Sequence, residues 1–335
     1  MLTFITLESR SITDSNSPPT HPDISAYQIL SDLFRRVLIR AKRIDGKAVA
    51  EKVRDEVARE VEEWVSAGNR KPGLAVVLVG EDPASATYVR GKERASLEVG
   101  MHSETRNLPA DVTQDELLAV IAELNADDRI TGFLVQLPLP DHIDDDTVLH
   151  AIDPNKDVDG IHPFNMGLLL GGKPRLAPAT PSGILRLLAE EGVDTTGKHV
   201  VICGRSNIVG RPLAALLLRR GQSGDATVTV CHSRTKDLGS FTRQADILVS
   251  AMGVLGLITK DMVKPGAVVI DVGTVRVDDP SRERGWRLAG DMALDVRDVA
   301  SLRTPVPGGV GPMTIAMLLK NVMQAAHLTA EASEK

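Results

Sequence analysis

Apolar side chains in the first half of the chain follow a helical spacing and then a continuous run. An amphipathic helix is predicted over residues 46–67 by apolar side chains on one face: Val49, Val53, Val57, Val61 and Trp64. The next run, Leu74–Val79, is apolar at every position, which is typical of a strand covered on both faces in a parallel sheet. The pattern therefore predicts that helices and strands alternate from Ile44 onward.

Further helices and a strand extend this first block. Asp82-Pro83 is typical of an N-cap and first helical turn, and Gly100 is placed to end the helix, so we expect a helix over 83–99. A second helix should follow the capping box Thr113–Glu116. The run Gly132–Leu137 then predicts a strand, which gives a β-α-β-α-β block.

The second half of the chain repeats the alternation. After a helix over 181–191, four apolar runs predict strands separated by short helices: His199–Cys203, Thr227–Cys231, Asp246–Ala251 and Ala267–Val272. This order is typical of a doubly wound nucleotide-binding domain. A last helix is expected over 313–327. Its apolar face needs a partner surface, and packing back on the first domain is one option.

These patterns predict an α/β protein of two domains with a cleft between them. We interpret residues 43–178 as a parallel α/β catalytic domain and 179–304 as a Rossmann-type domain. Residues 1–42 are expected to be a disordered extension, because Ser, Thr, Pro and Asp dominate 9–25. A targeting peptide is disfavoured by the acidic residues Glu8, Asp14, Asp23 and Asp32, and a misassigned translation start is a third interpretation.

Composition narrows the function classes. With 335 residues, 42% of them hydrophobic, and a formal net charge of −6, the chain is not expected to attract nucleic acid or an anionic membrane. No apolar run reaches the ~20 residues of a membrane span. Cys203 and Cys231 are predicted to be buried residues of a reduced, cytoplasmic protein, and no metal site is predicted because no Cys or His cluster has zinc-ligand spacing.

A candidate cofactor turn follows the strand that ends at Cys203. The segment Gly204–Gly210 departs from the usual dinucleotide fingerprint, since Ser206 occupies the middle glycine position, and a turn without a ligand is an alternative. Its place between a strand and a helix suits a pyrophosphate. The next strand is followed by Ser233 and Arg234, with no acidic residue for a ribose hydroxyl, which favours NADP over NAD. Arg234 could equally be a solvated surface charge.

Candidate catalytic residues lie in the first domain. Tyr88 and Lys92 are one helical turn apart and should project from one face, although an exposed pair without function is the common case. The pair precedes the cofactor turn and lies in another domain, which argues against a short-chain dehydrogenase. Gln136 follows an apolar strand, and Asp159 lies in the connection between the domains, where ligands often bind.

Five motifs occur together and in order: Pro83-Ala-Ser-x-x-Tyr88-x-x-x-Lys92, Val135-Gln-Leu-Pro-Leu-Pro140, Lys156-Asp-Val-Asp-Gly160, Gly204-Arg-Ser-x-Ile-Val-Gly-Arg-Pro212 and Thr304-Pro-Val-Pro-Gly-Gly-Val-Gly-Pro-Met313. From about Arg43 to about His327 the chain resembles bifunctional methylenetetrahydrofolate dehydrogenase/methenyltetrahydrofolate cyclohydrolase. The resemblance implies oxidation of 5,10-methylenetetrahydrofolate with NADP, followed by hydrolysis of the methenyl cation to 10-formyltetrahydrofolate. It also implies a homodimer that forms through the nucleotide domain.

The resemblance implies roles for individual residues. Lys92 is the acid/base group of the hydrolytic step, Gln136 is its hydrogen-bond partner, Tyr88 stacks on the folate ring system and Asp159 binds the pterin. The remaining substrate contacts that it implies are Val135, Leu137, Pro307, Gly308 and Gly309. The cofactor contacts are Gly204, Arg205, Ser206, Ile208, Gly210, Ser233, Arg234 and Thr274.

Three positions depart from this family pattern. Val275 replaces an Asn near the nicotinamide end, Gly91 lies mid-helix beside Lys92, and the loop Asp278–Gly285 is long and expected to be exposed. Two other functions stay open: a dehydrogenase without the hydrolytic step, and a non-catalytic NADP-binding sensor. An amino-acid or shikimate dehydrogenase is disfavoured by the folate motifs.

Overall fold

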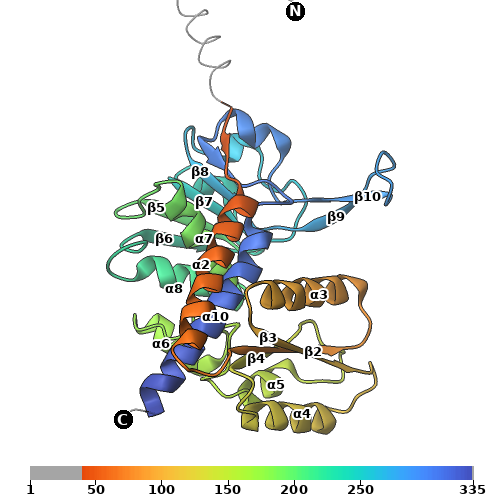
Figure 1. Ribbon diagram of the computed structural model, residues 1–335. Coiled ribbons are helices and arrows are strands. Elements are labelled where there is room, and N and C mark those ends of the chain that lie inside the picture. Colours follow the sequence, from red (N-terminus) through yellow and green to blue (C-terminus); the bar gives the residue numbers. More distant parts are fainter. Residues whose placement is uncertain (1–39, 334–335) are drawn as a thin grey trace, which may run out of the picture. The chain divides into compact units, whose positions relative to one another are not determined.

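A computed structural model describes residues 40–333 of the chain (Figure 1). The extension predicted over 1–42 therefore lies outside the described residues except at its last three positions. There the prediction was wrong: Lys42 belongs to strand β1 (Lys42–Arg43), which pairs in parallel with β11 (Leu302–Arg303).

The first sheet has three parallel strands in the order β3-β2-β4. The bounds are Gly73–Val79 for β2, His102–Leu108 for β3 and Gly132–Val135 for β4. The central strand β2 is buried at every position, as its apolar run predicts. Strand β3 was missed, and β4 ends before the predicted Leu137. Because β3 is a half-buried edge strand of polar residues, it lacks the apolar run by which its neighbours are recognised.

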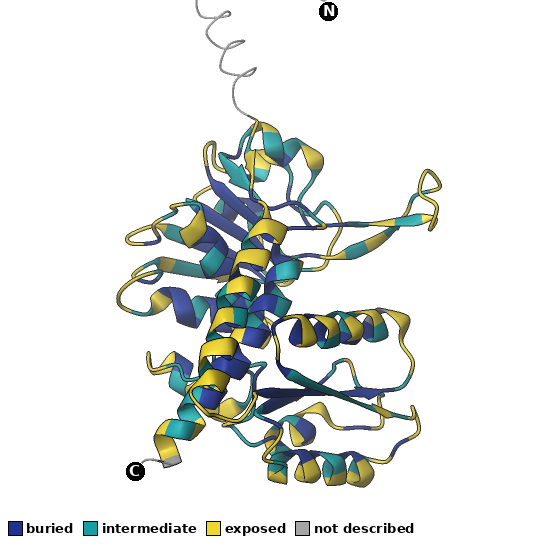
Figure 2. Ribbon diagram, viewed as in Figure 1, coloured by how far each residue is buried: buried dark blue, intermediate teal, exposed yellow. Residues whose placement is uncertain are grey.

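Helices lie on both faces of this sheet, and their outer faces are exposed (Figure 2). Helix α3 (Pro83–Glu98) lies on one face, and α4 (Gln114–Ala126) and α5 (Asp145–Ala151) lie on the other (Figure 1). Of the two remaining helices of this half, α2 (Gly46–Ser66) packs mainly against the last helix and α6 (Pro163–Leu170) packs against α8 (Gly210–Leu218). The predicted caps are present. The Asp82 carboxylate accepts a hydrogen bond from the Ser85 N–H at 2.7 Å, and Thr113 and Glu116 form a reciprocal capping box.

The second sheet has six parallel strands in the order β1-β11-β8-β7-β5-β6. Its longer strands are β5 (His199–Cys203), β6 (Thr227–Cys231), β7 (Ile247–Ser250) and β8 (Val268–Asp271), all close to their predicted bounds. The connecting helices are α7 (Ala179–Glu190), α8 (Gly210–Leu218) and α9 (Leu238–Thr242), with short 3-10 turns η1 (Lys260–Met262) and η2 (Leu294–Asp298). The doubly wound domain predicted from the apolar runs is confirmed.

A hairpin that was not predicted projects from the second sheet at the right of Figure 1. Strands β9 (Val275–Asp278) and β10 (Trp286–Ala289) pair antiparallel. The loop expected to be exposed, Asp278–Gly285, lies at its tip, and most of its residues are exposed.

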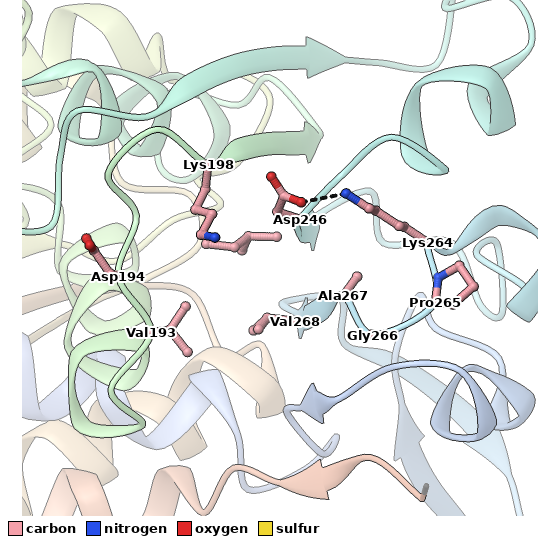
Figure 3. A pocket seen from close by; sticks show the side chains of 10 residues that line it. Val193, Asp194, Lys198, Asp246, Lys264, Pro265, Gly266, Ala267 and Val268 are labelled. Carbon is pink, nitrogen blue, oxygen red and sulfur yellow. Dashed lines mark hydrogen bonds and ion pairs between the residues drawn. The ribbon is translucent and has the colours of Figure 1, made fainter. Parts of the chain in front are cut away.

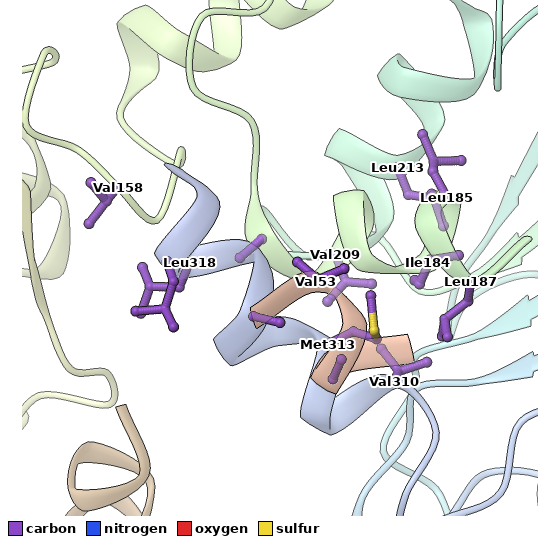
Figure 4. Packing of buried hydrophobic residues seen from close by; sticks show 14 of the residues in the cluster. Val53, Val158, Ile184, Leu185, Leu187, Val209, Leu213, Val310, Met313 and Leu318 are labelled. Carbon is purple, nitrogen blue, oxygen red and sulfur yellow. The ribbon is translucent and has the colours of Figure 1, made fainter. Parts of the chain in front are cut away.

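The final helix α10 (Val310–Ser333) packs against both α2 and α7. Figure 4 shows Val310, Met313 and Leu318 of this helix among buried side chains of the neighbouring helices. The same hydrophobic cluster includes Val76 of the first sheet and Ile202 of the second. The apolar face of the last helix therefore joins the cores that lie against the two sheets.

Among residues 40–333, no helix combines the length and the apolar character that crossing a membrane requires.

Candidate active site

Tyr88 and Lys92 lie on α3, whose first turn is fixed by the Asp82 cap. Lys92 Nζ lies 5.0 Å from the centroid of the Tyr88 ring. Lys92 is only 3% exposed, although it is a lysine on a helix that borders the outside of the domain. A buried ammonium is costly unless polar groups surround it, so the neighbours of Lys92 decide its chemistry.

Gln136 is the direct polar partner of Lys92. It follows β4 at the carboxyl edge of the sheet, and its backbone N–H donates to the Val77 carbonyl at 2.8 Å. The side-chain Oε1 accepts a hydrogen bond from Lys92 Nζ at 3.1 Å, while Nε2 donates to the Leu137 carbonyl at 2.7 Å. Since Nε2 is engaged elsewhere, the amide presents its acceptor oxygen to the lysine in a fixed orientation.

Burial shifts the pKa of both side chains, in opposite senses. Loss of solvent lowers the pKa of Lys92, and the negative charge of Asp159 acts against this by favouring the ammonium form. Burial raises the pKa of Tyr88 to about 12, although its hydrogen bond with Thr314 opposes the shift. The phenol therefore keeps its proton over the physiological range, while the lysine is brought closer to releasing its own.

Asp159 is positioned by the neighbouring carboxylate Asp157. Asp157 is buried, and it accepts hydrogen bonds from Gly160 N at 3.0 Å, His162 N at 2.8 Å and Asn165 Nδ2 at 2.9 Å. These bonds fix the turn. Gly160 has a φ of +70°, and a Cβ there would lie 2.5 Å from the Ala177 carbonyl carbon. Asp157 is therefore structural, whereas Asp159 is free to face the cavity.

A cavity of about 200 Å³ brings most of these side chains together. It is lined by Tyr88, Lys92, Gln136, Leu137, Asp159, Ile161, Pro178, Ala179, Thr180, Ile208 and Thr314. Ile208 comes from the predicted cofactor turn, so the lysine site and that turn share one cavity. Of the other predicted substrate contacts, Val135 is buried within β4, and Pro307–Gly309 do not line this cavity.

Thr180 and Thr314 were not predicted as site residues. Their hydroxyl oxygens are 2.8 Å apart, and both line the cavity. Thr314 directly follows the motif that ends at Met313, so its neighbourhood was a usable signal. For Thr180 the sequence offered none, because its partner is distant in the chain.

Gly308 and Gly309 form a tight loop against the start of α2. Gly308 has a φ of +98°, and a Cβ on Gly46 would lie 1.9 Å from the Gly309 carbonyl oxygen. The backbone of this loop thus approaches a neighbour in the way only glycine allows. A contact with substrate at Pro307–Gly309 stays a prediction.

The cofactor turn lies where the carboxyl ends of β5 and β6 meet. Cys203 and Cys231 pair in register, so the segments that follow them leave the sheet at the same edge. Gly204 has a φ of +130°, and a Cβ on Gly210 would lie 2.1 Å from the Gly204 carbonyl oxygen.

Residues 205–208 of this turn are exposed ahead of α8, as are Ser233 and Arg234 at the end of β6 and Thr274 after β8. This exposed backbone and the cationic side chains fit a dinucleotide with a 2′-phosphate. In the Rossmann-type sheet, the carboxyl edge therefore carries the predicted cofactor residues.

A second depression lies at the opposite edge of the same sheet (Figure 3). It has a volume of about 310 Å³ and includes Lys198, Asp246 and Lys264. Lys264 Nζ is 2.6 Å from an Asp246 oxygen, so these two charges neutralise each other. Ligands of open α/β sheets bind beyond the carboxyl ends of the strands, which makes this depression a poor cofactor site. Among residues 40–333, no cluster of His, Cys, Asp and Glu could hold a metal ion.

Comparisons with known families agree with this geometry. Residues 44–159 match the model of the tetrahydrofolate dehydrogenase/cyclohydrolase catalytic domain, and residues 178–330 match the NAD(P)-binding domain of the same enzymes. The chain belongs to the tetrahydrofolate dehydrogenase/cyclohydrolase family. The predicted α/β fold with one catalytic and one cofactor-binding domain is thereby confirmed, and the chain is an enzyme.

Relatives of this family are similar over nearly their whole length. The bifunctional protein FolD of Salinibacter ruber is 56% identical over 291 residues, which are 87% of this chain and 97% of that protein. The corresponding protein of Rhodopirellula baltica is 53% identical over 302 residues, which are 87% of this chain and 98% of that protein.

Two solved structures have the same fold. FolD from Campylobacter jejuni is 47% identical with a TM-score of 0.81, covering 86% of this chain and 99% of its own. FolD from Trypanosoma brucei, solved with NADP and an inhibitor, is 43% identical with a TM-score of 0.82, covering 87% and 98%. The tetrahydrofolate dehydrogenase/cyclohydrolase predicted from the motifs is thus confirmed, as is NADP as its cofactor.

Proposed function

We propose that this chain oxidises 5,10-methylenetetrahydrofolate to the 5,10-methenyl cation with NADP, and that Lys92 then manages the proton transfers that convert this cation to 10-formyltetrahydrofolate. One observation supports the assignment above all. A buried lysine with a lowered pKa donates to a fixed amide, in a cavity that also contains Ile208 of the cofactor turn. Both reactions therefore use one cavity.

The oxidation depends on positioning. NADP, when bound at the turn 204–210, supplies the hydride acceptor. Ile208 extends from that turn to the cavity, and the half-buried Tyr88 ring offers an apolar face for a folate ring. Asp159 offers a carboxylate to the amino and N–H donors of a pterin. These side chains would hold the reacting carbon near the acceptor, which is the main need of a hydride transfer.

The hydrolysis needs an acid/base group. Water adds to the methenyl carbon and loses a proton, and the ring C–N bond then breaks to leave the formyl group on one nitrogen. In its neutral form Lys92 can accept the proton of the attacking water, and in its ammonium form it can return a proton to the leaving nitrogen. Gln136 holds the amine in place while it changes charge. The protonated Tyr88 phenol cannot serve as the base.

We predict that Lys92→Gln abolishes methenyl hydrolysis and retains measurable dehydrogenase activity, because the substitution removes the titrating group and leaves the cofactor turn intact. Methenyl absorbance and NADPH absorbance would be followed separately, with methenyltetrahydrofolate and methylenetetrahydrofolate as substrates. Lys52→Gln, at an exposed salt bridge with Glu190, is a matched control that should keep both activities.

Three outcomes would count against the proposal. Unchanged hydrolysis in the Lys92 variant would remove this residue from its role. Methenyl accumulation by the natural protein itself would support a dehydrogenase without the hydrolytic step. Absence of NADP reduction would support a non-catalytic NADP-binding protein.

The proposal extends to the cofactor contacts and the setting of the enzyme. Arg205, Ser233 and Arg234 would bind the 2′-phosphate, and Thr274 would contact the nicotinamide end. Arg205→Ala combined with Arg234→Ala should raise the KM for NADP more than that for NAD. By analogy with the family, we also propose that the protein is a homodimer and lies in the cytoplasm. Sedimentation equilibrium would test the oligomeric state.

A further inference from the structure

Two buried carboxylates lie at the carboxyl edge of the second sheet, and neither has a part in the chemistry above. Asp271 is the last residue of β8, and Asp291 follows the β9–β10 hairpin. Asp271 is 5% exposed and Asp291 is not exposed at all. Charged groups are rarely buried without compensation, so each carboxylate should accept hydrogen bonds from buried donors.

Asp291 anchors the segment that follows β7. Its Oδ2 accepts hydrogen bonds from Ser250 Oγ and from Met252 N, both at 2.7 Å, and its Oδ1 accepts one from Val254 N at 2.9 Å. Every one of these donors belongs to residues 250–254. The carboxylate therefore takes the place of a backbone pairing partner for a stretch that has left the sheet.

Asp271 makes the complementary set of bonds. Its Oδ1 accepts from Gly273 N at 3.1 Å and Asp291 N at 3.0 Å, and its Oδ2 accepts from Met292 N at 3.0 Å. Each of the two carboxylates thus holds backbone N–H groups of a segment that lies beside the other.

Two glycines make this exchange possible. A Cβ on Gly273 would lie 2.0 Å from Asp291 Oδ1, and a Cβ on Gly290 would lie 2.0 Å from Asp271 Oδ2. The carboxylates occupy the volume that side chains would need at these positions. The two carboxylates consequently link three segments in series: Asp271 joins 271–274 to 290–292, and Asp291 joins 290–292 to 250–254.

The linked segments include Thr274, the residue assigned to the nicotinamide end. Thr274 is exposed directly after Gly273, whose N–H is held by Asp271. Lys92 and Gln136, by contrast, lie in the first domain and take part in none of these bonds. A disturbance of the carboxylate pair should therefore affect the two reactions unequally.

We infer that Asp271 and Asp291 are positioning residues for hydride transfer. Asp271 holds the backbone of 272–274 through Gly273 N, and Asp291 lies against Gly273 while it holds the neighbouring segment 250–254, so that together they keep this backbone in place for the nicotinamide ring. The inference rests on the proposed dehydrogenase reaction. It assigns to these residues no contact with substrate. They act through the backbone, so their loss should impair the dehydrogenase and spare the cyclohydrolase.

The test uses Asp291→Asn in the full-length protein. The amide has the same shape, but its nitrogen must replace one of the two oxygens, and each oxygen already accepts from a backbone N–H, Met252 N at Oδ2 and Val254 N at Oδ1. We expect the dehydrogenase kcat to fall by about tenfold or more, because the variant loses one charge-assisted hydrogen bond. The rate of methenyl hydrolysis should stay unchanged within about twofold. Methylenetetrahydrofolate labelled with deuterium at the transferred position should show a larger isotope effect in the variant, because hydride transfer becomes slower relative to product release.

Two further variants make the result decisive. Ser250→Ala removes one donor to Asp291 without adding a new one, and should lower the dehydrogenase activity in the same selective way but less. Asp246→Asn alters a carboxylate at the other end of β7, where it accepts from His199 N, and should change neither activity.

Parallel loss of both activities in the Asp291 and Ser250 variants would show a merely structural role and overturn the inference. Unchanged dehydrogenase activity and isotope effect in both variants would overturn it equally. Absence of either activity in the natural protein would instead count against the proposed function, so the two failures are distinguishable.

Discussion

Lys92 is under two opposed influences. Burial favours its neutral form, whereas the negative charge of Asp159 favours the ammonium form. Asp159 therefore sets how far the pKa of the lysine can fall, in addition to any contact with the pterin. The influence of Asp159 on the pKa of Lys92 can be measured apart from substrate binding, because the pH dependence of kcat/KM reports the pKa values of the free enzyme.

We predict that Asp159→Asn lowers the pKa of Lys92 further, since the variant removes the charge that stabilises the ammonium form. The acidic limb of the pH profile of kcat/KM for methenyl hydrolysis should move to lower pH, whatever the loss in absolute rate. A limb that moved to higher pH, or stayed in place, would contradict the assigned influence of Asp159 on Lys92.

Asp271 should give the stability of the protein a measurable pH dependence. Burial and the neighbouring charge of Asp291 raise its pKa from 3.8 to about 6. The folded state therefore holds this proton more tightly than the unfolded state does. The resulting contribution is fully present below about pH 4 and is lost as the pH rises through about 6, a change of about 3 kcal/mol.

The comparison of the natural protein with Asp271→Asn isolates this contribution, because the amide does not titrate. We predict that the natural protein loses unfolding free energy relative to the variant between pH 4 and pH 7, as measured by urea denaturation. A constant difference over this range would show that the pKa of Asp271 is not raised.

At the level of single residues, sequence reasoning selected side chains that the structure brings into one cavity. Lys92 was recognisable because it lies one helical turn from Tyr88 on a predicted helix, Gln136 because it follows a strand, and Asp159 because it lies in the connection between the domains. Thr180 and Thr314 were missed, since their contact joins positions 134 residues apart and leaves no local pattern. Val135 was assigned to substrate but is buried in its own strand and does not line the cavity.

Among the elements, α10 has a role beyond covering a hydrophobic face. Its residue Asn321 is 8% exposed, and the side-chain Nδ2 donates to the carbonyls of Val158 and Ala177, both at 2.8 Å. These carbonyls belong to the residues beside Asp159 and Pro178, two residues that line the active cavity. The Asn321 side chain on α10 thus fixes the backbone next to two cavity-lining residues, Asp159 and Pro178.

Asn321→Leu should lower the free energy of unfolding by about 2–3 kcal/mol, because one buried and one partly buried carbonyl oxygen lose their shared donor. Both enzyme activities should fall together, in contrast to the Asp291 variant. Chemical denaturation measures the first effect, and Gln324→Leu, at an exposed position of the same helix, is the matched control. A variant as stable as the control would show that the Asn321 bonds do not contribute.

Sequence patterns predicted the elements that have a continuous apolar run or a cap, and missed those that do not. Strand β5 was placed at its observed bounds because every residue but the first is buried. Strand β3 is polar at the sheet edge, and β9 alternates between exposed and half-buried positions in a solvated hairpin. The two-residue strands β1 and β11 are too short for any periodicity.

For the whole molecule, the continuous cluster around α10 predicts cooperative unfolding. Side chains from both sheets contribute to it, so neither sheet keeps its full hydrophobic core when the other unfolds. We therefore expect the two family domains to unfold together.

The two tryptophans offer a direct test, since Trp64 lies on α2 and Trp286 on β10. Trp64→Phe and Trp286→Phe each leave a single reporter, one for each part of the molecule. We predict that, within each variant, the fluorescence of the remaining tryptophan and the circular dichroism signal change with the same midpoint. Because the two signals are compared within one variant, a difference in stability between the variants does not affect the result. Separate fluorescence and circular dichroism midpoints within one variant would show that the domains unfold independently.

The pairing of β1 with β11, and of α2 with α10, joins the beginning of the described chain to its end. During translation α2 is made well before α10, the helix that covers its apolar face. Until α10 has been made, part of the apolar face of α2 stays uncovered, which is the condition under which chaperones bind. Because the active cavity needs Thr314 of α10, it is complete only after this helix has been made. We expect a chain that stops before α10 to be inactive and prone to aggregation.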